Sequence, residues 1–206
     1  MTYPPAFHET FMRLALREAE RSARAGEVPA GCLIVRAPEN PDAPPAAARV
    51  IGRAHNQTGL LKDPTAHAEM IAITQAAAAL GDWRLGGTIL YVTKEPCPMC
   101  AGAIILARIP TVVYGLADPK RGGGTVFNLF GHPGLNHRPV LLGGVLEEAC
   151  RDQFTAFFRT CRDGGVAKPD AEDGESSRIT PAKTGNKGAG ARVQVRHTSR
   201  TLNPES

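Results

Sequence analysis

Residues 90–103 read LYVTKEPCPMCAGA, an apolar run that passes into a segment with two cysteines three residues apart. The residue before a proline is pushed out of the helical region, so Cys97 should be extended, and Pro98 suits the first position of a helix. Cys97 then occupies the N-cap and Cys100 the third helical residue, positions at which capping side chains meet. The sequence therefore predicts a strand over residues 88–93, followed by a helix whose N-terminus carries both sulfurs.

A second short segment, the triplet HAE that begins at His67, lies thirty residues before the first of these cysteines. Asp63 is a suitable N-cap and Pro64 a suitable first helical residue, so we expect a helix from there to about Leu80. His67 and Glu69 fall in its first two turns. Two-residue spacing puts them on roughly opposite sides of an ideal helix, so periodicity alone does not bring both to one metal ion.

The two segments together match the His-x-Glu…Pro-Cys-x-x-Cys pattern of zinc nucleobase deaminases. A helix N-terminus favours thiolates, which prepares cysteines there to bind a cation. Zinc held by His67, Cys97 and Cys100 keeps a fourth position open for water and makes that water acidic near neutral pH. Glu69 is the carboxylate that can take the proton and pass it to a ring nitrogen.

Two other interpretations of the cysteine pair stay open from these residues alone. The pair could be redox-active, or it could be half of a structural zinc site, which would need a fourth ligand. The candidates for that ligand are Cys32, His55, Cys150 and Cys161. None of the four stands in a second closely spaced pair, and buried free cysteines are common. The histidine and glutamate of the first segment favour catalysis.

Beyond the zinc motifs, several segments of the chain resemble one family. They are residues 63–69 (DPTAHAE), 90–103, 114–120 (YGLADPK), 132–138 (HPGLNHR) and 157–159 (FFR). Over roughly residues 7–162 the chain resembles the bacterial tRNA-specific adenosine deaminases, which convert adenosine to inosine at the wobble position of an anticodon. The zinc motifs are shared across the wider deaminase superfamily, whereas the Asn-His-Arg and Phe-Phe-Arg segments are typical of the tRNA branch.

The resemblance implies an α/β fold, a three-layer αβα sandwich with a five-stranded mixed sheet of the cytidine deaminase-like type. It implies one Zn²⁺ per subunit on His67, Cys97 and Cys100, with Glu69 as the proton shuttle. It also implies that a tRNA anticodon stem-loop is the partner and that the protein works as a homodimer. The substrate-binding residues that it implies are Val28, Asn56, Asp118, Lys120, Asn136, His137, Arg138 and Phe158.

Apolar spacing predicts the remaining elements. The expected helices cover residues 7–25 and the segment from Leu146 onward; the expected strands cover residues 28–36, 49–54, 111–115 and 140–142. Strands that alternate with helices favour an α/β fold. On composition alone Asn56 would be a loop residue. Phe157 and Phe158 are adjacent, so only one of them can face the core, and the resemblance assigns Phe158 to the substrate.

Two segments are expected to be irregular. Residues 37–49, with four prolines and five alanines, should form a surface excursion, and Gly122–Gly124 a flexible connector. Residues 1–162 are predicted to be one zinc-dependent deaminase domain. Residues 163–206 lack periodicity and are expected to be a disordered tail. The tail is acidic up to Ser177 and basic from Arg178, so it is either inert or an electrostatic arm for tRNA.

Composition limits the setting. The net charge of +4 is too small to indicate nucleic acid by itself, so any RNA-binding surface must be a local patch. No apolar run reaches the roughly 18 residues of a membrane helix, and the first residues do not read as a signal peptide. Two of the five cysteines are assigned to metal, which fits a reducing cytoplasm. The competing functions are a small-molecule deaminase for guanine, cytosine or a cytidine compound, and a non-catalytic RNA-binding module.

Overall fold

A single mixed sheet lies at the centre of the protein. The computed structural model describes residues 3–164, so almost all of the predicted tail lies outside the described residues. The strands are β1 (Gly31–Arg36), β2 (Arg49–His55), β3 (Thr88–Lys94), β4 (Thr111–Leu116) and β5 (Val140–Leu142). They are ordered β2-β1-β3-β4-β5. β1 is antiparallel to both of its neighbours, whereas β3, β4 and β5 run parallel.

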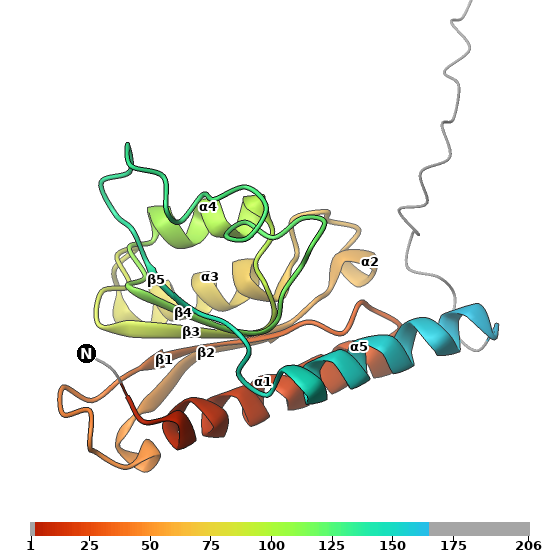
Figure 1. Ribbon diagram of the computed structural model, residues 1–206, viewed down its shortest axis with the longest axis horizontal. Coiled ribbons are helices and arrows are strands. Elements are labelled where there is room, and N and C mark those ends of the chain that lie inside the picture. Colours follow the sequence, from red (N-terminus) through yellow and green to blue (C-terminus); the bar gives the residue numbers. More distant parts are fainter. Residues whose placement is uncertain (1–2, 165–206) are drawn as a thin grey trace, which may run out of the picture. The chain divides into compact units, whose positions relative to one another are not determined.

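Helices cover both faces of this sheet. They are α1 (Pro5–Arg24), α2 (Thr58–Leu61), α3 (Ala68–Leu80), α4 (Pro98–Leu106) and α5 (Glu147–Arg162). α3 and α4 lie on one face, and α1 and α5 lie side by side on the other (Figure 1). The three-layer fold and the five-stranded mixed sheet are thus confirmed. None of the helices in residues 3–164 has the length and apolar character that a bilayer crossing requires. α5 ends at Arg162, where we place the domain boundary, which stays a prediction.

Each face of the sheet has its own apolar core. On the α1 and α5 side, Phe11 and Met12 of α1 pack with Leu33, Tyr91 and Val113 of the strands. On the other side, the small apolar residues of α3 and the Ile104–Ile105 pair of α4 cover β1, β3 and β4. β3 lies in the middle of the sheet and is buried along almost its whole length. It is therefore a rigid base for the residues that follow it.

The sheet has two ends with different content. β3 and β4 finish at one end, which we call the carboxyl edge; the opposite end, where they begin, is the amino edge. Because β1 is antiparallel to β3, its start pairs with the end of β3, with Cys32 opposite Val92. The start of β1 and the end of β2 therefore also lie at the carboxyl edge. In α/β sheets this is the end at which ligands bind.

The proline-rich excursion lies at the amino edge. Arg36, the last residue of β1, pairs with Thr88, the first residue of β3. The segment that follows Arg36 holds only a short 3₁₀ turn, Pro45–Ala47, and no residue in 37–48 is buried. The Tyr3 hydroxyl donates a hydrogen bond to the Pro38 carbonyl, 2.5 Å away, which fastens the excursion to the start of the chain. The expected surface excursion is confirmed.

Close packing of α1 on β1 leads to a test of stability. A Cβ atom on Gly31 would lie 2.1 Å from the Ala15 carbonyl oxygen and 2.5 Å from the Ala19 nitrogen. Because both atoms belong to the backbone of α1, the helix would have to move away from the sheet. We expect Gly31→Ala to lower the free energy of unfolding by about 1–3 kcal/mol. Urea denaturation measures this, and Gly86→Ala, at a position with open space, should leave stability nearly unchanged. Equal midpoints for the two variants would contradict the packing argument.

Candidate active site

The two cysteines lie at the start of α4, as the sequence predicts. Cys97 is the N-cap residue with extended backbone (φ −70°, ψ 172°), Pro98 is the first helical residue and Cys100 the third. The central strand β3 ends three residues before Cys97, and the Glu95 N–H continues its ladder by donating to the Leu116 carbonyl. The rigid strand thus delivers both sulfurs to the carboxyl edge of the sheet.

His67 reaches the same place in a different way from the one we predicted. The helix expected from Pro64 begins only at Ala68, and His67 is its N-cap. The reason is local: the Asp63 carboxylate accepts hydrogen bonds from both the Thr65 N–H and the Thr65 hydroxyl, each at 2.7 Å, and so holds a turn in place of a first helical turn. His67 therefore lies outside the helix, and the objection from two-residue helical spacing does not apply.

The three side chains form a compact triangle of donor atoms. His67 Nδ1 lies 3.7 Å from the Cys97 sulfur and 3.5 Å from the Cys100 sulfur, and the two sulfurs are 3.7 Å apart. Tetrahedral zinc, with Zn–S near 2.3 Å and Zn–N near 2.0–2.1 Å, requires about 3.8 Å between sulfurs and about 3.6 Å between sulfur and nitrogen. The triangle therefore has the size that zinc needs.

The number and chemistry of the donors also fit zinc. In the described part of the chain, no fourth histidine, cysteine or carboxylate joins this group. The pKa of the Cys97 thiol is lowered to about 4, because the Cys100 thiol and the His67 ring hydrogen-bond to its sulfur and the Cys100 N–H adds a further bond. The hydrogen bond between Cys100 and Cys97 raises the pKa of the Cys100 thiol, and burial raises it further. The lowered pKa favours the thiolate form of Cys97, which is the form that binds zinc.

Glu69 lies in the first turn of α3, directly beside these donors. Its side chain is buried, with 5% of its surface exposed. Burial raises the pKa of Glu69, while the His67 ring nearby lowers it and the Cys97 sulfur raises it. A carboxyl group whose pKa is shifted toward neutrality can both accept and release a proton during a reaction. The predicted proton shuttle therefore lies in a suitable environment.

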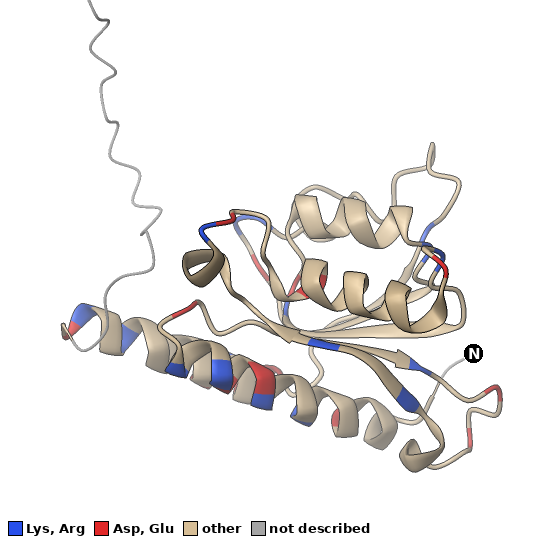
Figure 2. Ribbon diagram, turned by 180° about the vertical axis from the view of Figure 1, so that it is seen from behind, with Lys and Arg blue, Asp and Glu red and all other residues tan. Residues whose placement is uncertain are grey.

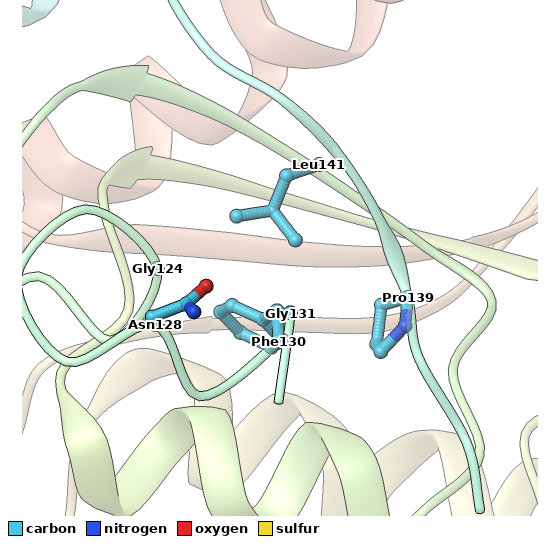
Figure 3. A pocket seen from close by; sticks show the side chains of 6 residues that line it. All are labelled: Gly124, Asn128, Phe130, Gly131, Pro139 and Leu141. Carbon is cyan, nitrogen blue, oxygen red and sulfur yellow. The ribbon is translucent and has the colours of Figure 1, made fainter. Parts of the chain in front are cut away.

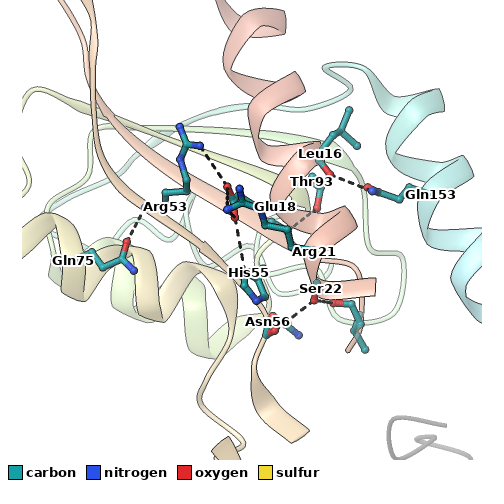
Figure 4. A network of polar contacts seen from close by, with 12 residues as sticks. Leu16, Glu18, Arg21, Ser22, Arg53, His55, Asn56, Gln75, Thr93 and Gln153 are labelled. Atoms are coloured by element: carbon teal, nitrogen blue, oxygen red, sulfur yellow. Dashed lines mark hydrogen bonds and ion pairs between the residues drawn. The ribbon is translucent and has the colours of Figure 1, made fainter. Parts of the chain in front are cut away.

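Asn56 and the segment at Val28 also come together at the carboxyl edge. Asn56 follows β2 directly, is buried, and accepts a hydrogen bond from the Ala68 N–H through Oδ1 at 3.0 Å. The Ser22 hydroxyl bridges the Val28 carbonyl (2.7 Å) and the Asn56 carbonyl (3.4 Å); Figure 4 shows Ser22 and Asn56 in this network. The side-chain oxygen of Asn56, Oδ1, accepts the N–H at the start of α3. The NH₂ group of the same amide is therefore the part that can face a substrate.

A turn after β4 completes this edge. The Asp118 carboxylate pairs with Lys94 at 2.6 Å and accepts the backbone N–H groups of Lys120 (3.0 Å) and Arg121 (3.1 Å). The hydrogen bond with Cys97 raises the pKa of His67, while burial and, to a smaller extent, the positive charge of Arg121 oppose this shift. Both oxygens of Asp118 are thus engaged within the protein, and its contact with substrate stays a prediction.

The glycine run in this turn is not the flexible connector that we expected. A Cβ atom on Gly122 would lie 2.3 Å from a Glu95 oxygen, and one on Gly123 would lie 2.7 Å from the Ala101 Cβ. The Gly123 N–H also donates to the Pro96 carbonyl, 2.8 Å away. The glycines allow the turn to pack closely against the residues beside Cys97. A cavity of about 230 Å³ opens behind them (Figure 3), and its lining consists of Gly124, Asn128, Phe130, Gly131, Pro139 and Leu141.

The Asn-His-Arg segment lies elsewhere. Asn136 accepts a hydrogen bond from the Arg108 side chain at 2.5 Å, and the His137 ring nitrogen bonds the Ile109 carbonyl at 2.8 Å. Both partners follow the C-terminal end of α4, whereas Cys97 and Cys100 are at its N-terminal end. The segment precedes β5, which is parallel to β4, so topology places it at the amino edge. Any contact of Asn136, His137 or Arg138 with substrate would therefore lie away from the donor triangle.

Phe158 is exposed enough to contact a substrate, the role that the resemblance assigns to it. Phe157 is buried in the core with 5% of its surface exposed, while Phe158 is half-buried. Phe158 packs against Phe154, with ring centroids 4.8 Å apart, and the Lys94 ammonium lies 5.0 Å from the Phe154 ring. A chain of contacts thus runs from Phe158 to the ion pair of Asp118. The core residue of the pair is confirmed as Phe157, and substrate contact by Phe158 stays a prediction.

Two buried glutamates at this edge escaped the sequence analysis. Glu95, 3% exposed, precedes the Pro-Cys motif, and Glu27, 4% exposed, precedes β1. Glu27 accepts hydrogen bonds from the Thr58 hydroxyl (3.0 Å) and the Leu60 N–H (2.7 Å) and so holds α2. The sequence did contain a signal for them, since each carboxylate stands next to an apolar strand and is therefore expected to be buried. A buried charge requires several hydrogen-bond donors, which marks such a residue as structurally important.

Comparisons with known proteins agree with this geometry. The profile described as the cytidine and deoxycytidylate deaminase zinc-binding region matches residues 5–116. The tRNA-specific adenosine deaminase of Bacillus subtilis is 45% identical over 155 residues, 75% of this chain and 90% of that protein. The Aquifex aeolicus protein of the same name is 44% identical over 156 residues, 75% of this chain and 96% of that protein. The chain belongs to the tRNA-specific adenosine deaminase family.

Solved structures extend the comparison for this deaminase. One from a study of A-to-I editing by tRNA:A34 deaminases at the wobble position has a TM-score of 0.63 and 41% identity; the match covers 70% of this chain and 98% of that one. A guanine deaminase from Nitrosomonas europaea, at 18% identity and a TM-score of 0.56, covers 76% of this chain and 86% of that one and shares the fold. The deaminase fold and the zinc motifs thus agree with the predicted cofactor, zinc.

The donor triangle predicts how metal content responds to substitution. Cys97→Ser should reduce bound zinc from about one ion per chain toward none, because a tetrahedral site with three protein ligands loses one of them. Metal analysis of purified protein by mass spectrometry measures this. Cys161→Ser, a buried thiol in α5, serves as the control and should retain zinc. Full zinc content in Cys97→Ser would show that the triangle is not the metal site.

Proposed function

We propose that this protein hydrolytically deaminates adenosine to inosine at the wobble position of a tRNA anticodon. The observation that carries the proposal is the triangle of His67, Cys97 and Cys100, of the size that tetrahedral zinc requires, with buried Glu69 beside it. The substrate follows from relatives named tRNA-specific adenosine deaminases, at 44–45% identity, and from the structure of a tRNA:A34 deaminase at 41%.

Each side chain has a separate task in this reaction. Zinc on these three ligands would supply a Lewis acid that makes water acidic near neutral pH. Glu69 takes a proton from the water that attacks C6 of the adenine ring and delivers it to N1. As the C6–N bond breaks, the carboxylate helps to protonate the leaving amine, so that adenosine and water become inosine and ammonia. Burial excludes bulk water from this proton transfer.

The carboxyl edge also offers groups that would bind the RNA. The NH₂ group of Asn56 and the backbone near Val28 would hold the extruded base, since single-stranded bases are read through their edges. Lys120 and Arg121 are exposed on the turn beside the metal ligands, where they would meet phosphate groups. Asp118 would contribute by holding that turn, Phe158 by stacking, and Asn136, His137 and Arg138 by contacts farther along the RNA.

The decisive experiment offers one enzyme preparation several substrates. An anticodon stem-loop with adenosine at the wobble position should yield inosine, whereas free adenosine, cytidine and guanine should not react. Liquid chromatography of the nuclease-digested products measures each conversion. A matched stem-loop with adenosine moved one position from the wobble site is the control. Conversion confined to a free base or nucleoside would overturn the proposal in favour of a small-molecule deaminase.

A variant of the shuttle separates catalysis from a structural zinc site. Glu69→Gln keeps the size of the side chain but cannot accept the proton, so kcat on the stem-loop should fall by about 10²–10⁴-fold. Zinc content should be unchanged, because Glu69 is not among the ligands. Turnover and metal content are measured on the same sample. Retained turnover would contradict the role of Glu69 and favour a structural metal.

We also propose that the protein works as a homodimer in the cytoplasm. The layer formed by α3 and α4 supports the dimer, because α3 carries one charged residue, the buried Glu69, and α4 carries none. Figure 2 shows these two helices almost without charge, while α1 and α5 carry many charged residues. Leu106 on α4 is 72% exposed, and such uncharged surfaces mark protein contacts. Free thiols and a tRNA substrate both suit a reducing compartment.

The dimer can be tested on this helix layer. Leu106→Lys should shift the protein from dimer to monomer, because a charge would be buried in the contact. Light scattering coupled to size exclusion gives the mass. Thr160→Lys, on an exposed turn of α5 at the other face of the sheet, is the matched control and should leave the mass unchanged. A monomeric wild-type protein would contradict the proposal.

A further inference from the structure

Glu95 lies between the metal ligands and the turn of residues 118–125, and all of its acceptor capacity is directed at that turn. Oε2 accepts the Asp118 N–H and the Thr125 hydroxyl, each at 2.9 Å. Oε1 accepts the N–H groups of Gly124 (3.1 Å) and Thr125 (2.8 Å). Four donors thus converge on one carboxylate that is 3% exposed. Hydrogen bonds to an ionised acceptor are the strong ones, and together they compensate for burying the charge.

These contacts fix both ends of the turn. Asp118 is at its start and Gly124 and Thr125 are at its end; of the residues between them, 119–121 are exposed, whereas Gly122 and Gly123 are buried. The residue before Glu95 reinforces the start, because Lys94 pairs with the Asp118 side chain at 2.6 Å. Two consecutive residues, Lys94 and Glu95, therefore hold the turn, and they directly precede the Pro-Cys motif.

The same contacts link the turn to the metal centre. Pro96 and Cys97 follow Glu95, and the Gly123 N–H donates to the Pro96 carbonyl at 2.8 Å. The exposed cations of the turn, Lys120 and Arg121, are thus held at a defined place relative to the ligand Cys97.

We propose that Glu95 is a positioning residue for the RNA substrate: it holds the turn of residues 118–125 so that its cations meet phosphate groups of the RNA while the target base lies at the metal centre. The inference rests on the proposed function and deepens it, because it assigns recognition of a polynucleotide to this turn. Glu95 is not an acid or a base in the reaction, since all four donors around it belong to the turn and occupy both oxygens.

Steady-state kinetics on the anticodon stem-loop test this assignment with Glu95→Gln. The glutamine side chain has the size of the glutamate side chain, but an NH₂ group replaces one of the two oxygens. This hydrogen-bond donor would face the donors of the turn. We expect KM for the stem-loop to rise about tenfold, the cost of weakening charge-assisted hydrogen bonds. kcat should stay within about twofold and zinc content should be unchanged. Glu147→Gln, which removes an exposed ion pair with Arg151 on α5, is the matched control and should behave as wild type.

A double-substitution cycle supplies the readout that a general loss of stability would not give. If Glu95 acts through the cations, Lys120→Ala should raise KM several-fold in the wild type but much less in the Glu95→Gln background. Should Glu95→Gln fail to fold, Thr125→Val, which removes one of the four donors, replaces it, with Thr125→Ser as the variant that restores KM.

Three results would overturn the inference: independent effects of Glu95→Gln and Lys120→Ala, loss of zinc, or a fall in kcat at constant KM. A wild-type enzyme that leaves the stem-loop unchanged would overturn the proposed function and this inference with it. That outcome is distinguishable, because it appears before any variant is compared.

Discussion

The site depends on two helices that begin at the same edge of one sheet. α3 and α4 start next to each other, and their N-cap residues, His67 and Cys97, are two of the three residues that we propose as zinc ligands. The third, Cys100, lies one turn into α4. Unpaired N–H groups at helix starts favour negative charge, which is what thiolates bring. The donor triangle is thus a consequence of where the two helices begin.

Sequence reasoning was reliable where chemistry is local. A cysteine before a proline has few backbone choices, so the start of α4 could be placed to the residue. It failed at α3, because Asp63 and Pro64 satisfy the rules for a helix start and also those for a turn. The hydrogen bonds from Thr65 to the Asp63 carboxylate favour the turn over the helix start. Helix propensities do not take such side-chain hydrogen bonds into account.

Features that depend on long-range contacts were harder to predict. The glycines at 122–124 have the composition of a flexible linker, and only the proximity of Glu95 and Ala101 shows why side chains are excluded there. The Asn-His-Arg segment belongs to the family pattern, but its distance from the zinc ligands follows from the parallel pairing of β4 and β5. Recognising a family motif identifies which residues matter without showing which of them lie together.

The proline-rich excursion shows how such a fold can change in length. It joins β1 to β2 at the amino edge, whereas the reacting groups lie at the far end of the central strand, about 20 Å away for seven residues. Insertions and deletions at this connection lie at the opposite edge of the sheet from the donor triangle and from the turn of residues 118–125. A protein engineer could therefore attach a label at this hairpin without approaching the reacting groups.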